Sequence, residues 1–264
     1  MQLYGIGDLH LSLGVPEKPM DIFHGWENYM QLLEQHWRAM VQPEDTVVLA
    51  GDLSWGMTLP QAKADFAFLE TLPGQKIILK GNHDYWWNSM KKMQQFFADN
   101  GFDSLHILHN NHYAFQQYGI CGTRGWVSIN GETADAKVLA REVQRLEVSI
   151  QSALKEQLTP IVFLHYPPIY GNSYNYEILE VLHRYAITEC YYGHIHGKAH
   201  QYAFEGVYEE TKMHLISGDY IQFNTKLPTT LSAHTRTGHT TRPLLTKHRN
   251  ATSSPNTFRS IRQS

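Results

Sequence analysis

Short apolar runs recur along the chain and predict buried strands. Residues 46–50, 76–80 and 161–164 are rich in Val, Ile and Leu, and each run ends at a polar, turn-like cluster. A similar segment follows Met1 at residues 2–7. Apolar runs of this length, bounded by turns, are typical of strands that are covered on both faces of a sheet. We therefore expect a layered sheet whose strands end in polar loops.

Apolar residues at helical spacing lie between these strands. One helix is predicted over residues 26–40, where three or four residues separate successive apolar positions: Trp26, Met30, Leu33, Trp37 and Met40. A second is predicted over residues 136–158, before Pro160, with one apolar face formed by Leu139, Val143, Leu146 and Ile150. Further along, Gly206 separates residues 201–204 from residues 207–208, which predicts a β-hairpin.

The order of these elements predicts the fold class. Strands and helices alternate first, and a strand-rich region follows at residues 191–218. This order is typical of an α/β fold, here a two-sheet β-sandwich flanked by helices. We assign residues 1–224 to this domain.

The segment from residue 225 to residue 264 differs in composition from the rest. It is rich in Thr, Ser, Arg and His, it has no apolar period, and it contains seven basic residues and no acidic one. Such a segment buries too little surface to offset the entropy of ordering it. We expect a disordered basic tail, either a solvated appendage or an arm for an acidic partner.

The charge of the remaining chain narrows the function classes. Residues 1–224 hold all 25 acidic residues and only 15 of the 22 basic ones. A broad nucleic-acid groove needs clustered Lys and Arg, so nucleic acid is not the expected partner. An acidic domain suits a site whose charge is balanced by bound cations.

Three features of the sequence bear on its location. The chain has no run of about 18 apolar residues that could span a membrane, and no segment with the pattern of a signal peptide. Its two cysteines, Cys121 and Cys190, could pair but are too few for a disulfide framework. We expect a cytoplasmic protein without membrane contact.

Five short polar segments stand at the ends of predicted strands. They are Gly7-Asp8-Leu9-His10, Ala50-Gly51-Asp52, Lys80-Gly81-Asn82-His83-Asp84, Leu164-His165-Tyr166-Pro167 and Tyr192-Gly193-His194-Ile195-His196. Taken singly, each has an ordinary structural explanation, since Asp often closes turns and a lone His is often a core residue. Taken together, they place seven possible metal ligands at neighbouring strand ends.

The spacing inside two of these segments supports a shared site. Side chains alternate along a strand, so Asp8 and His10 can point the same way while Leu9 turns into the core. His194 and His196 can do the same around Ile195. Glycines adjoin the candidates at residues 7, 51, 81 and 193, where the backbone must turn sharply or approach an ion closely.

The chemistry of the candidate ligands indicates which metals could bind. The set contains two Asp, one Asn and four His, namely Asp8, His10, Asp52, Asn82, His165, His194 and His196. Mixed oxygen and imidazole ligands suit Mn²⁺, Fe or Zn²⁺ better than Ca²⁺ or a structural zinc ion. Seven ligands are too many for one tetrahedral ion. We therefore expect two divalent metal ions, with Mn²⁺ the first choice.

The five segments resemble the calcineurin-like metallophosphoesterase family. Its pattern is D-x-H, G-D, G-N-H-[DE], a later histidine after a strand, and G-H-x-H, and every motif occurs here in order between Asp8 and His196. Residues 122–126 and 165–168 also resemble a bacterial subgroup of predicted phosphohydrolases. The chain departs from the pattern at residues 164–167, which read L-H-Y-P where many relatives have G-H, and in the tail.

The resemblance implies a ligand set and a mechanism. One metal would be held by Asp8, His10 and His196, and the other by Asn82, His165 and His194, with Asp52 as the bridge. The metals would lie at the carboxyl ends of the strands of the sandwich. A hydroxide bridging the two ions would attack phosphorus in line. The expected function is hydrolysis of a phosphomonoester or phosphodiester, on a phosphorylated small-molecule substrate.

Two residues beside the ligands are expected to take part in catalysis. By the family pattern, His83 contacts the scissile phosphate, stabilises its charge and protonates the leaving oxygen. Asp84 would orient the His83 ring. The alternative for Asp84 is the N-cap of a helix that starts at Tyr85.

Aromatic and basic residues near the motifs are candidates for substrate binding. Four tryptophans, Trp55, Trp86, Trp87 and Trp126, either fill the core where loops pack or form a wall for a planar leaving group. Arg124 could clamp a phosphate in a bidentate contact or pair with a surface Glu. The charges of residues 141–145 are expected to form pairs on a helix surface.

Two alternative functions belong to other classes. Some members of the family are metal-binding interaction modules without catalysis, but these typically lack a ligand or the equivalent of His83. A nuclease is the second alternative, with the basic tail supplying the positive charge that the domain lacks.

Overall fold

The computed structural model describes residues 1–126 and 136–224. The chain divides into two compact units, Met1–Thr229 and Thr230–Ser264, and the second unit lies outside the described residues. The predicted tail at residues 225–264 also falls outside them. The sheets, the helices and the candidate site all belong to the first unit.

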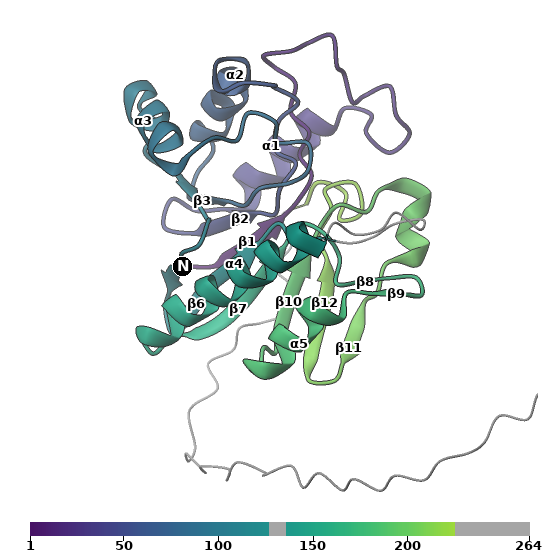
Figure 1. The fold of residues 1–264 in the computed structure, drawn as a ribbon. Coiled ribbons are helices and arrows are strands. Elements are labelled where there is room, and N and C mark those ends of the chain that lie inside the picture. Colours follow the sequence, from purple (N-terminus) through teal and green to yellow (C-terminus); the bar gives the residue numbers. More distant parts are fainter. Residues whose placement is uncertain (127–135, 225–264) are drawn as a thin grey trace, which may run out of the picture. The chain divides into compact units, whose positions relative to one another are not determined.

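The first sheet contains four parallel strands in chain order. They are β1 (Leu3–Ile6), β2 (Thr46–Leu49), β3 (Gln75–Ile78) and β4 (Leu105–Ile107) (Figure 1). The predicted strands at residues 2–7, 46–50 and 76–80 correspond to β1, β2 and β3. Because the strands are parallel, their carboxyl ends meet at one edge of the sheet.

The second sheet contains six strands in the order β11-β12-β10-β7-β6-β5. Its four central strands are parallel, and the two edge strands pair antiparallel to their neighbours. The strand bounds are β5 (Tyr113–Phe115), β6 (Tyr118–Thr123), β7 (Thr159–Leu164), β10 (Glu189–Tyr192), β11 (Gly206–Tyr208) and β12 (Thr211–Leu215). A separate pair is formed by β8 (Ile169–Tyr170) and β9 (Ser173–Tyr174).

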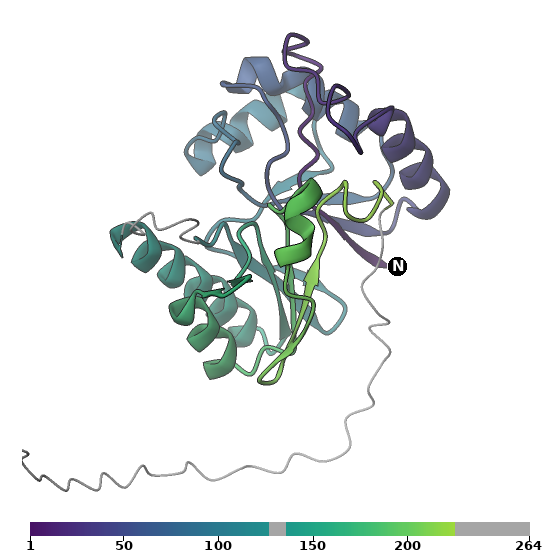
Figure 2. The same ribbon diagram turned by 90° about the vertical axis from the view of Figure 1, so that its right-hand side faces the viewer.

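Helices cover the outer face of each sheet, as Figures 1 and 2 show. The first sheet carries α1 (Tyr29–Met40), α2 (Leu59–Glu70) and α3 (Met90–Asn100). The second carries α4 (Ala136–Lys155), which packs on β6 and β7, and α5 (Tyr176–Arg184). Three of the helices begin at a side-chain cap, because Thr58, Ser89 and Asn175 each accept a backbone N–H from the first turn.

Successive side chains of a strand point to opposite faces of its sheet, so apolar strands contribute to the core on both faces. Val47 and Leu49 of β2 pack with the helices of the first sheet, while Val48 between them faces the other way and is also fully buried. A Cβ atom added at Gly5 of β1 would lie 3.2 Å from side-chain atoms of Phe163 and Ile216. The inner faces of the two sheets therefore contact each other, and a strand that is covered on both faces has to be apolar throughout.

The prediction of an α/β fold with helices flanking the sheets is confirmed. The predicted helix at 136–158 is α4, with Leu146 and Ile150 fully buried, and the helix at 26–40 begins later, at Tyr29. The predicted hairpin is wrong in its first strand. Residues 201–204 are not a strand, since a 3₁₀ helix spans Gly197–Tyr202, and β11 pairs with β12 instead.

Two further expectations can be compared with the described residues. Cys121 and Cys190 are both buried and free, so they do not pair with each other. In the two described stretches of the chain, no helix has the length and apolar character needed to cross a bilayer.

The carboxylate of Asp65 in α2 ties together the loops that follow β1 and β2. It accepts the backbone N–H of Leu13 at 2.8 Å and the hydroxyl of Ser54. Burial raises the pKa of Asp65 from 3.8 to about 6, although these hydrogen bonds oppose the shift. Asp65 therefore fixes the loops that carry candidate ligands. Its burial disfavours the ionised carboxylate.

We expect this carboxylate to make stability fall as pH rises through its titration range. Between pH 3.8 and about 6 the folded chain holds a proton on Asp65 that the unfolded chain has lost, so raising the pH favours unfolding. The free energy of unfolding should drop by roughly 3 kcal/mol from this group alone. Denaturant titrations across pH 4–7 should show that Asp65→Asn lacks this component, whereas Asp99→Asn, at an exposed site, keeps it. Parallel profiles for wild type and Asp65→Asn would contradict the assignment.

Candidate metal centre

The candidate ligands come from the carboxyl ends of five strands. Asp8 and His10 follow β1, Asp52 follows β2, Asn82 follows β3, His165 follows β7, and His194 and His196 follow β10. The two sheets are joined at this edge, where the N–H of Gly7 donates to Ile216 O at 2.7 Å and the N–H of Gly218 donates to Gly7 O at 3.0 Å. This connection brings ligands of both sheets to one place.

The structure groups six of the seven candidates into two clusters that could each hold a metal ion. In each cluster, one ligand atom per residue lies within 4.8 Å of the others, and the clusters are Asp8 with His10 and His196, and Asp52 with His165 and His194. These groups match the division that the family resemblance implies. Asn82 adjoins the second cluster, because its Oδ1 lies 2.7 Å from His165 Nε2.

In the first cluster, one oxygen of Asp8 and one nitrogen of His196 face each other, at a place where a cation could bind. Asp8 Oδ2 accepts the backbone N–H of His194 at 2.8 Å, which leaves Asp8 Oδ1 buried without a hydrogen-bond partner. His196 Nε2 lies 3.4 Å from that oxygen and also lacks a hydrogen-bond partner among the described residues. A carboxylate oxygen and an imidazole nitrogen that face each other at this distance fit two ligands of one cation.

In the second cluster, a backbone carbonyl orients a candidate ligand, the ring of His165. His165 Nδ1 lies 3.0 Å from Ala50 O, and because a carbonyl can only accept, this nitrogen carries the proton. Nε2 then presents its lone pair toward Asn82 Oδ1. Two electron-pair donors at this separation suit the ligands of one cation, and a carbonyl that fixes the tautomer is a common partner of ligating histidines.

Asp52 lies between the two clusters. Its Oδ2 is 3.8 Å from His10 Nε2 and 3.5 Å from His165 Nε2, so it faces a candidate ligand of each cluster. Its Oδ1 accepts the backbone N–H of His83 at 2.7 Å. This is the position that a bridging carboxylate would need.

The backbone at these residues is strained. Asp8, His10, Asp52 and His194 all have positive φ, between 44° and 73°, a region that non-glycine residues rarely adopt. They lie in loops just beyond the strands, so the predicted strand alternation does not explain why Asp8 and His10 point together. Leu9 is buried, as predicted, and strain of this kind concentrates at functional sites.

Two glycines are required by the packing of these loops. A Cβ atom at Gly81 would lie 2.1 Å from Asp52 Oδ1, and one at Gly193 would lie 2.4 Å from Asp8 Oδ2. Any side chain at either position would displace a candidate ligand. The predicted role of these glycines, close approach of backbone to the site, is therefore supported by the geometry.

The electrostatics of the site favour cations. Burial lowers the pKa of His10 and of His194 to about 3, which keeps both rings neutral and able to bind metal. Burial raises the pKa of Asp52, and the nearby carboxylates of Asp84 and Asp8 raise it further. Burial alone would lower the pKa of His196, but the nearby carboxylates of Asp8 and Asp219 raise it to about 10. Three buried carboxylates at one site need compensating positive charge.

Comparison with known proteins agrees with this geometry. The model of the calcineurin-like phosphoesterase family matches residues 1–198, three quarters of the chain, and the seven candidate ligands lie inside this range. The chain belongs to the calcineurin-like phosphoesterase family. A search of curated proteins finds no match.

Two solved structures are similar to this family member. One is a protein of unknown function, AQ665, from Aquifex aeolicus, with 15% identity, a TM-score of 0.43, and coverage of 84% of this chain and 94% of that one. The other is TT1561 of Thermus thermophilus, with 13% identity, a TM-score of 0.46, and coverage of 74% and 82%.

The role of Asp84 differs from both predicted alternatives. Within the described residues its carboxylate accepts backbone N–H groups from Asp52 at 2.9 Å, Leu53 at 2.8 Å and Gly81 at 2.7 Å, and the indole N–H of Trp86 at 3.0 Å. It does not contact the His83 ring directly. It is not a helix N-cap either, because α3 begins at Met90 with Ser89 as its cap. Asp84 instead clamps the loop after β2 to the loop after β3.

Removing this clamp should destabilise the family member strongly. Asp84→Ala would leave at least four donors buried without an acceptor, and we expect a loss of about 3–5 kcal/mol in the free energy of unfolding. Asp84→Asn keeps one carbonyl oxygen and should lose less. Urea titrations monitored by tryptophan fluorescence test this order, and equal midpoints for wild type and Asp84→Ala would refute it.

His83 lies beside the clusters without belonging to either. Its ring is half buried and its centroid lies 5.8 Å from that of His10 and 4.7 Å from that of Trp55. Burial lowers the pKa of His83, and His165 lowers it further. A ring that borders the metal ligands and remains accessible fits the proposed contact with a phosphate.

Asp219 belongs to none of the family motifs and was not predicted from the sequence. Asp219 Oδ1 lies 3.0 Å from His196 Nδ1, and its Oδ2 accepts the N–H of Gly197 at 2.9 Å. His200 Nε2 lies 3.3 Å from the same Oδ2. The only sequence signal was a Gly-Asp pair after a strand, the same signal as at Gly51-Asp52. Asp219 fixes the ring of a candidate ligand.

We expect Asp219→Asn to weaken metal binding about 10- to 100-fold, because carboxylates that orient ligating histidines typically contribute this much. The loss should fall on one ion of the pair. Competition with a chromophoric chelator would measure both affinities, and Asp103→Asn, an exposed change of the same chemistry, serves as the control. Unchanged affinity for both ions would show that Asp219 has no such role.

The predicted substrate-binding residues lie near the second cluster. Arg124 pairs with Glu142 at 3.6 Å. One predicted alternative was a pair with a surface Glu, but Glu142 is buried. The Arg124 guanidinium lies 5.1 Å from the ring of Trp126, which in turn lies 5.5 Å from the ring of Tyr166. Tyr166 contacts His194, with a centroid separation of 4.3 Å.

The other predicted aromatic residues divide between core and site. Trp86 is fully buried in the core of the first sheet, and Trp87 packs partly against it. Trp55 stacks on the His10 ring with a centroid separation of 4.9 Å. The core interpretation thus holds for Trp86, and Trp55 forms part of the wall of the metal centre.

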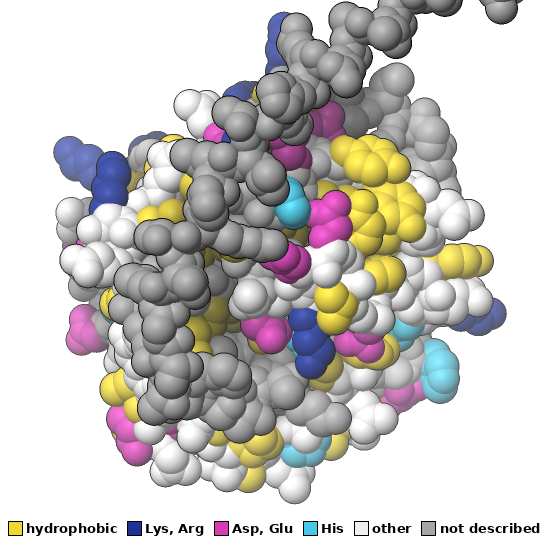
Figure 3. Space-filling model, turned by 90° about the horizontal axis from the view of Figure 1, so that it is seen from below, with side chains coloured by type: hydrophobic (Ala, Val, Ile, Leu, Met, Phe, Trp, Pro, Cys, Tyr) yellow, Lys and Arg dark blue, Asp and Glu magenta, His cyan; other side chains and the backbone are white. Residues whose placement is uncertain are grey.

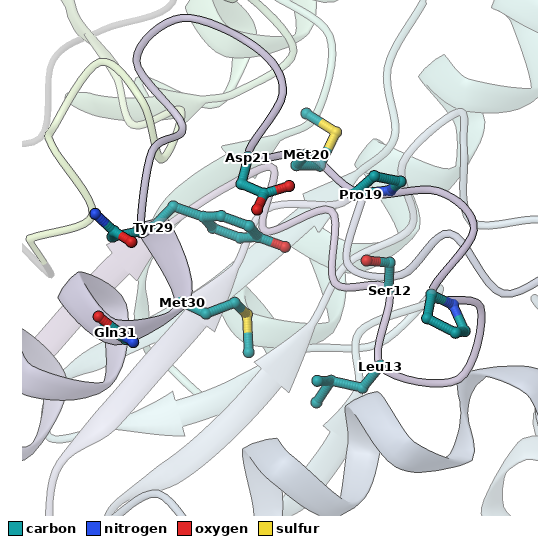
Figure 4. A pocket seen from close by; sticks show the side chains of 10 residues that line it. Ser12, Leu13, Pro19, Met20, Asp21, Tyr29, Met30 and Gln31 are labelled. Carbon is teal, nitrogen blue, oxygen red and sulfur yellow. The ribbon is translucent and has the colours of Figure 1, made fainter.

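A separate pocket of about 370 Å³ lies beside the loop that follows His10 (Figure 4). Its lining is largely apolar, with Leu13, Met20 and Met30 among the contributors, and Asp21 is its one charged residue. The hydroxyl of Tyr29, also in the lining, donates to His10 O at 3.2 Å. The pocket therefore shares a wall with the backbone of the metal centre.

Proposed function

We propose that this chain is a metal-dependent phosphohydrolase that cleaves a phosphomonoester or phosphodiester at a centre for two divalent ions. Two observations support the proposal: the two neighbouring groups of candidate ligands, and the Oδ2 atom of Asp52 in the second group, which lies 3.8 Å from His10 Nε2 in the first and 3.5 Å from His165 Nε2 in its own. Asp8, His10 and His196 would hold one ion, and Asn82, His165 and His194 the other, with Asp52 between them. Mn²⁺ is the expected metal, with Fe or Zn²⁺ as alternatives.

The protein residues would bind and orient the reacting groups. When bound, two divalent ions supply Lewis acidity and a nucleophilic oxygen at neutral pH. His83 would contact the phosphate and hold the proton for the leaving oxygen. Asp84 would keep the loops of Asp52 and Asn82 in place, and Asp219 would keep the His196 ring in place.

Two alternative functions receive less support. An inactive metal-binding module would have no reason to keep His83 beside a complete ligand set. Where Figure 3 shows described residues, Lys and Arg side chains are scattered among acidic ones, and residues 1–224 carry more acidic than basic residues, which does not suit a nuclease groove. The nuclease would regain support if DNA binding depended on salt and disappeared after deletion of residues 225–264.

A turnover screen tests the proposed function. The full chain, reconstituted with Mn²⁺, would be assayed against an aryl phosphomonoester, an aryl phosphodiester, a cyclic nucleotide and a nucleotide. We expect turnover of at least one class, which Asp52→Asn and His83→Ala should lose. If wild type and both variants are equally inert on all four, the enzyme proposal fails. Independently, metal analysis should find two ions per chain, and saturation at one ion would refute the paired centre.

A further inference from the structure

The backbone of His83 is held by hydrogen bonds, but its ring is held by packing. The N–H of His83 donates to Asp52 Oδ1 at 2.7 Å, and its carbonyl accepts the N–H of Tyr85 at 2.8 Å. Within the described part of the chain, the ring nitrogens of His83 take part in no hydrogen bond. Asp84, which was expected to orient this ring, accepts backbone N–H groups instead. The orientation of the proposed general acid therefore depends on the rings around it.

Trp55 makes the closest of these ring contacts. Its centroid lies 4.7 Å from that of His83, whereas the centroids of His10 and Tyr85 lie 5.8 and 6.2 Å away. Tyr85 is 57% exposed, so little holds its own ring in place. Trp55 is half-buried and therefore offers the firmer support.

The same indole ring contacts a candidate metal ligand. Trp55 stacks on His10 with a centroid separation of 4.9 Å and an interplanar angle of 23°. His10 belongs to the first cluster, and His83 lies beside it. One rigid ring thus touches the proposed general acid and a candidate ligand at once. It acts as a spacer between the two.

The backbone of Trp55 is anchored on both sides. Its N–H donates to Leu11 O at 2.9 Å, and its carbonyl accepts the ammonium of Lys18 at 3.2 Å. Both partners belong to the segment between β1 and α1, and Lys18 Nζ also lies 5.9 Å from the centroid of the indole ring. The preceding residue, Ser54, donates its hydroxyl to Asp65 of α2. The ring that supports His83 is therefore carried by a fixed loop.

We propose that Trp55 is a positioning residue that holds the His83 ring where it can protonate the leaving oxygen. A general acid has to lie within hydrogen-bond reach of the oxygen that it protonates, and a displacement of about 1 Å can lower the rate about 10²-fold. Trp55 acts through His83 and needs no contact with the reacting atoms. This inference rests on the proposed phosphohydrolase function.

A double-mutant cycle tests whether Trp55 acts through His83. Turnover of an aryl phosphomonoester with a poor leaving group would be measured for the Mn²⁺-loaded full chain. Trp55→Leu should lower kcat about 10- to 100-fold in the wild-type background but less than about twofold in the His83→Gln background, because residues that act as a unit are not additive. Trp55→Phe keeps an aromatic ring and should recover most of the loss.

The outcomes of the cycle separate this inference from the proposed function. Equal losses of kcat in the two backgrounds would overturn the inference while leaving the phosphohydrolase function intact. Loss of a metal ion from Trp55→Leu would overturn it as well, because the effect would then pass through His10. If wild type turns over no phosphate ester, the proposed function fails and the inference fails with it.

Nuclear magnetic resonance provides a readout without turnover. In the metal-free full chain, the ring signal of His83 is the histidine signal that is missing from His83→Gln. Trp55→Leu should shift this signal, because the indole ring next to it is removed. Trp87→Leu is the matched control, since Trp87 is also half-buried but its ring contacts Trp86 and His109. An unchanged His83 signal in Trp55→Leu, or equal shifts in both variants, would overturn the inference.

Discussion

Asp52→Asn is expected to lower turnover about 10²- to 10³-fold and to reduce metal content below two ions per chain. Asp52 Oδ2 faces His10 and His165 at 3.8 and 3.5 Å, so this atom borders both clusters at once. An Asn side chain keeps the shape but removes the negative charge, and one of its two terminal atoms carries hydrogens instead of lone pairs. Both ions would then lose a ligand through one substitution.

The tested residue and its control lie at opposite ends of β2. Turnover with Mn²⁺ and metal content by mass spectrometry would be measured for Asp52→Asn and for Asp45→Asn. Asp45 is also a buried carboxylate that accepts backbone N–H groups, but it lies at the amino end of β2. The control should lose stability and keep two ions. Two tightly bound ions in Asp52→Asn would contradict the bridging assignment.

His83→Gln is expected to lower kcat about 10²- to 10⁴-fold with little change in metal content. The ring lies outside both clusters, and its backbone N–H, which the substitution keeps, donates to Asp52 Oδ1 at 2.7 Å. The loss should therefore fall on chemistry and not on assembly of the site. The effect should also be smaller for a substrate with a good leaving group, since such a group needs less protonation.

Two aryl phosphomonoesters that differ only in leaving-group acidity provide the measurement. The ratio of their kcat values should widen in His83→Gln if the ring protonates the leaving oxygen. His106→Gln is the matched control, because His106 on β4 pairs with Gln75 away from the site. Loss of metal from His83→Gln, or an unchanged kcat ratio together with full turnover, would exclude the proposed role.

The candidate ligands could be predicted from the sequence because parallel strands impose a simple rule. A polar residue after a buried parallel strand lies at the same edge as its counterparts, whatever their separation along the chain. The rule accounts for Asp8, Asp52 and Asn82 in the first sheet and for His165 and His194 in the second, whereas the two sheets meet at this edge through the hydrogen bonds of Gly7 with Ile216 and Gly218. What the spacing did not predict was the left-handed backbone at Asp8 and His10, which arises because the loops hydrogen-bond to one another past the strand ends.

Asp84 shows where local reasoning fails. Its position before Tyr85 resembles a helix cap, but two of the N–H groups that it accepts come from Asp52 and Leu53, about thirty residues earlier. Asp219 was missed for the same reason, since its partner His196 lies 23 residues away. Side chains that support a site through long-range hydrogen bonds leave no periodic pattern in the sequence.

The wrong hairpin and the overlooked helices have different causes. Residues 201–204 have apolar character, but the chain after His196 turns into a 3₁₀ helix whose first N–H is held by Asp219. The helices α2 and α3 were not predicted, although Thr58 and Ser89 are caps of the expected type. In these short helices the caps are a clearer signal than the apolar spacing.

Each cluster combines residues from the beginning and from the end of the domain. The hydrogen bond from His194 to Asp8 closes a loop of 186 residues, and a bound ion would close it more firmly. A nascent chain released before His194 has neither cluster complete, however well its first sheet has folded. If the centre binds the proposed ions, metal loading would be a late event in biogenesis, and truncated translation products should emerge without a complete ligand set.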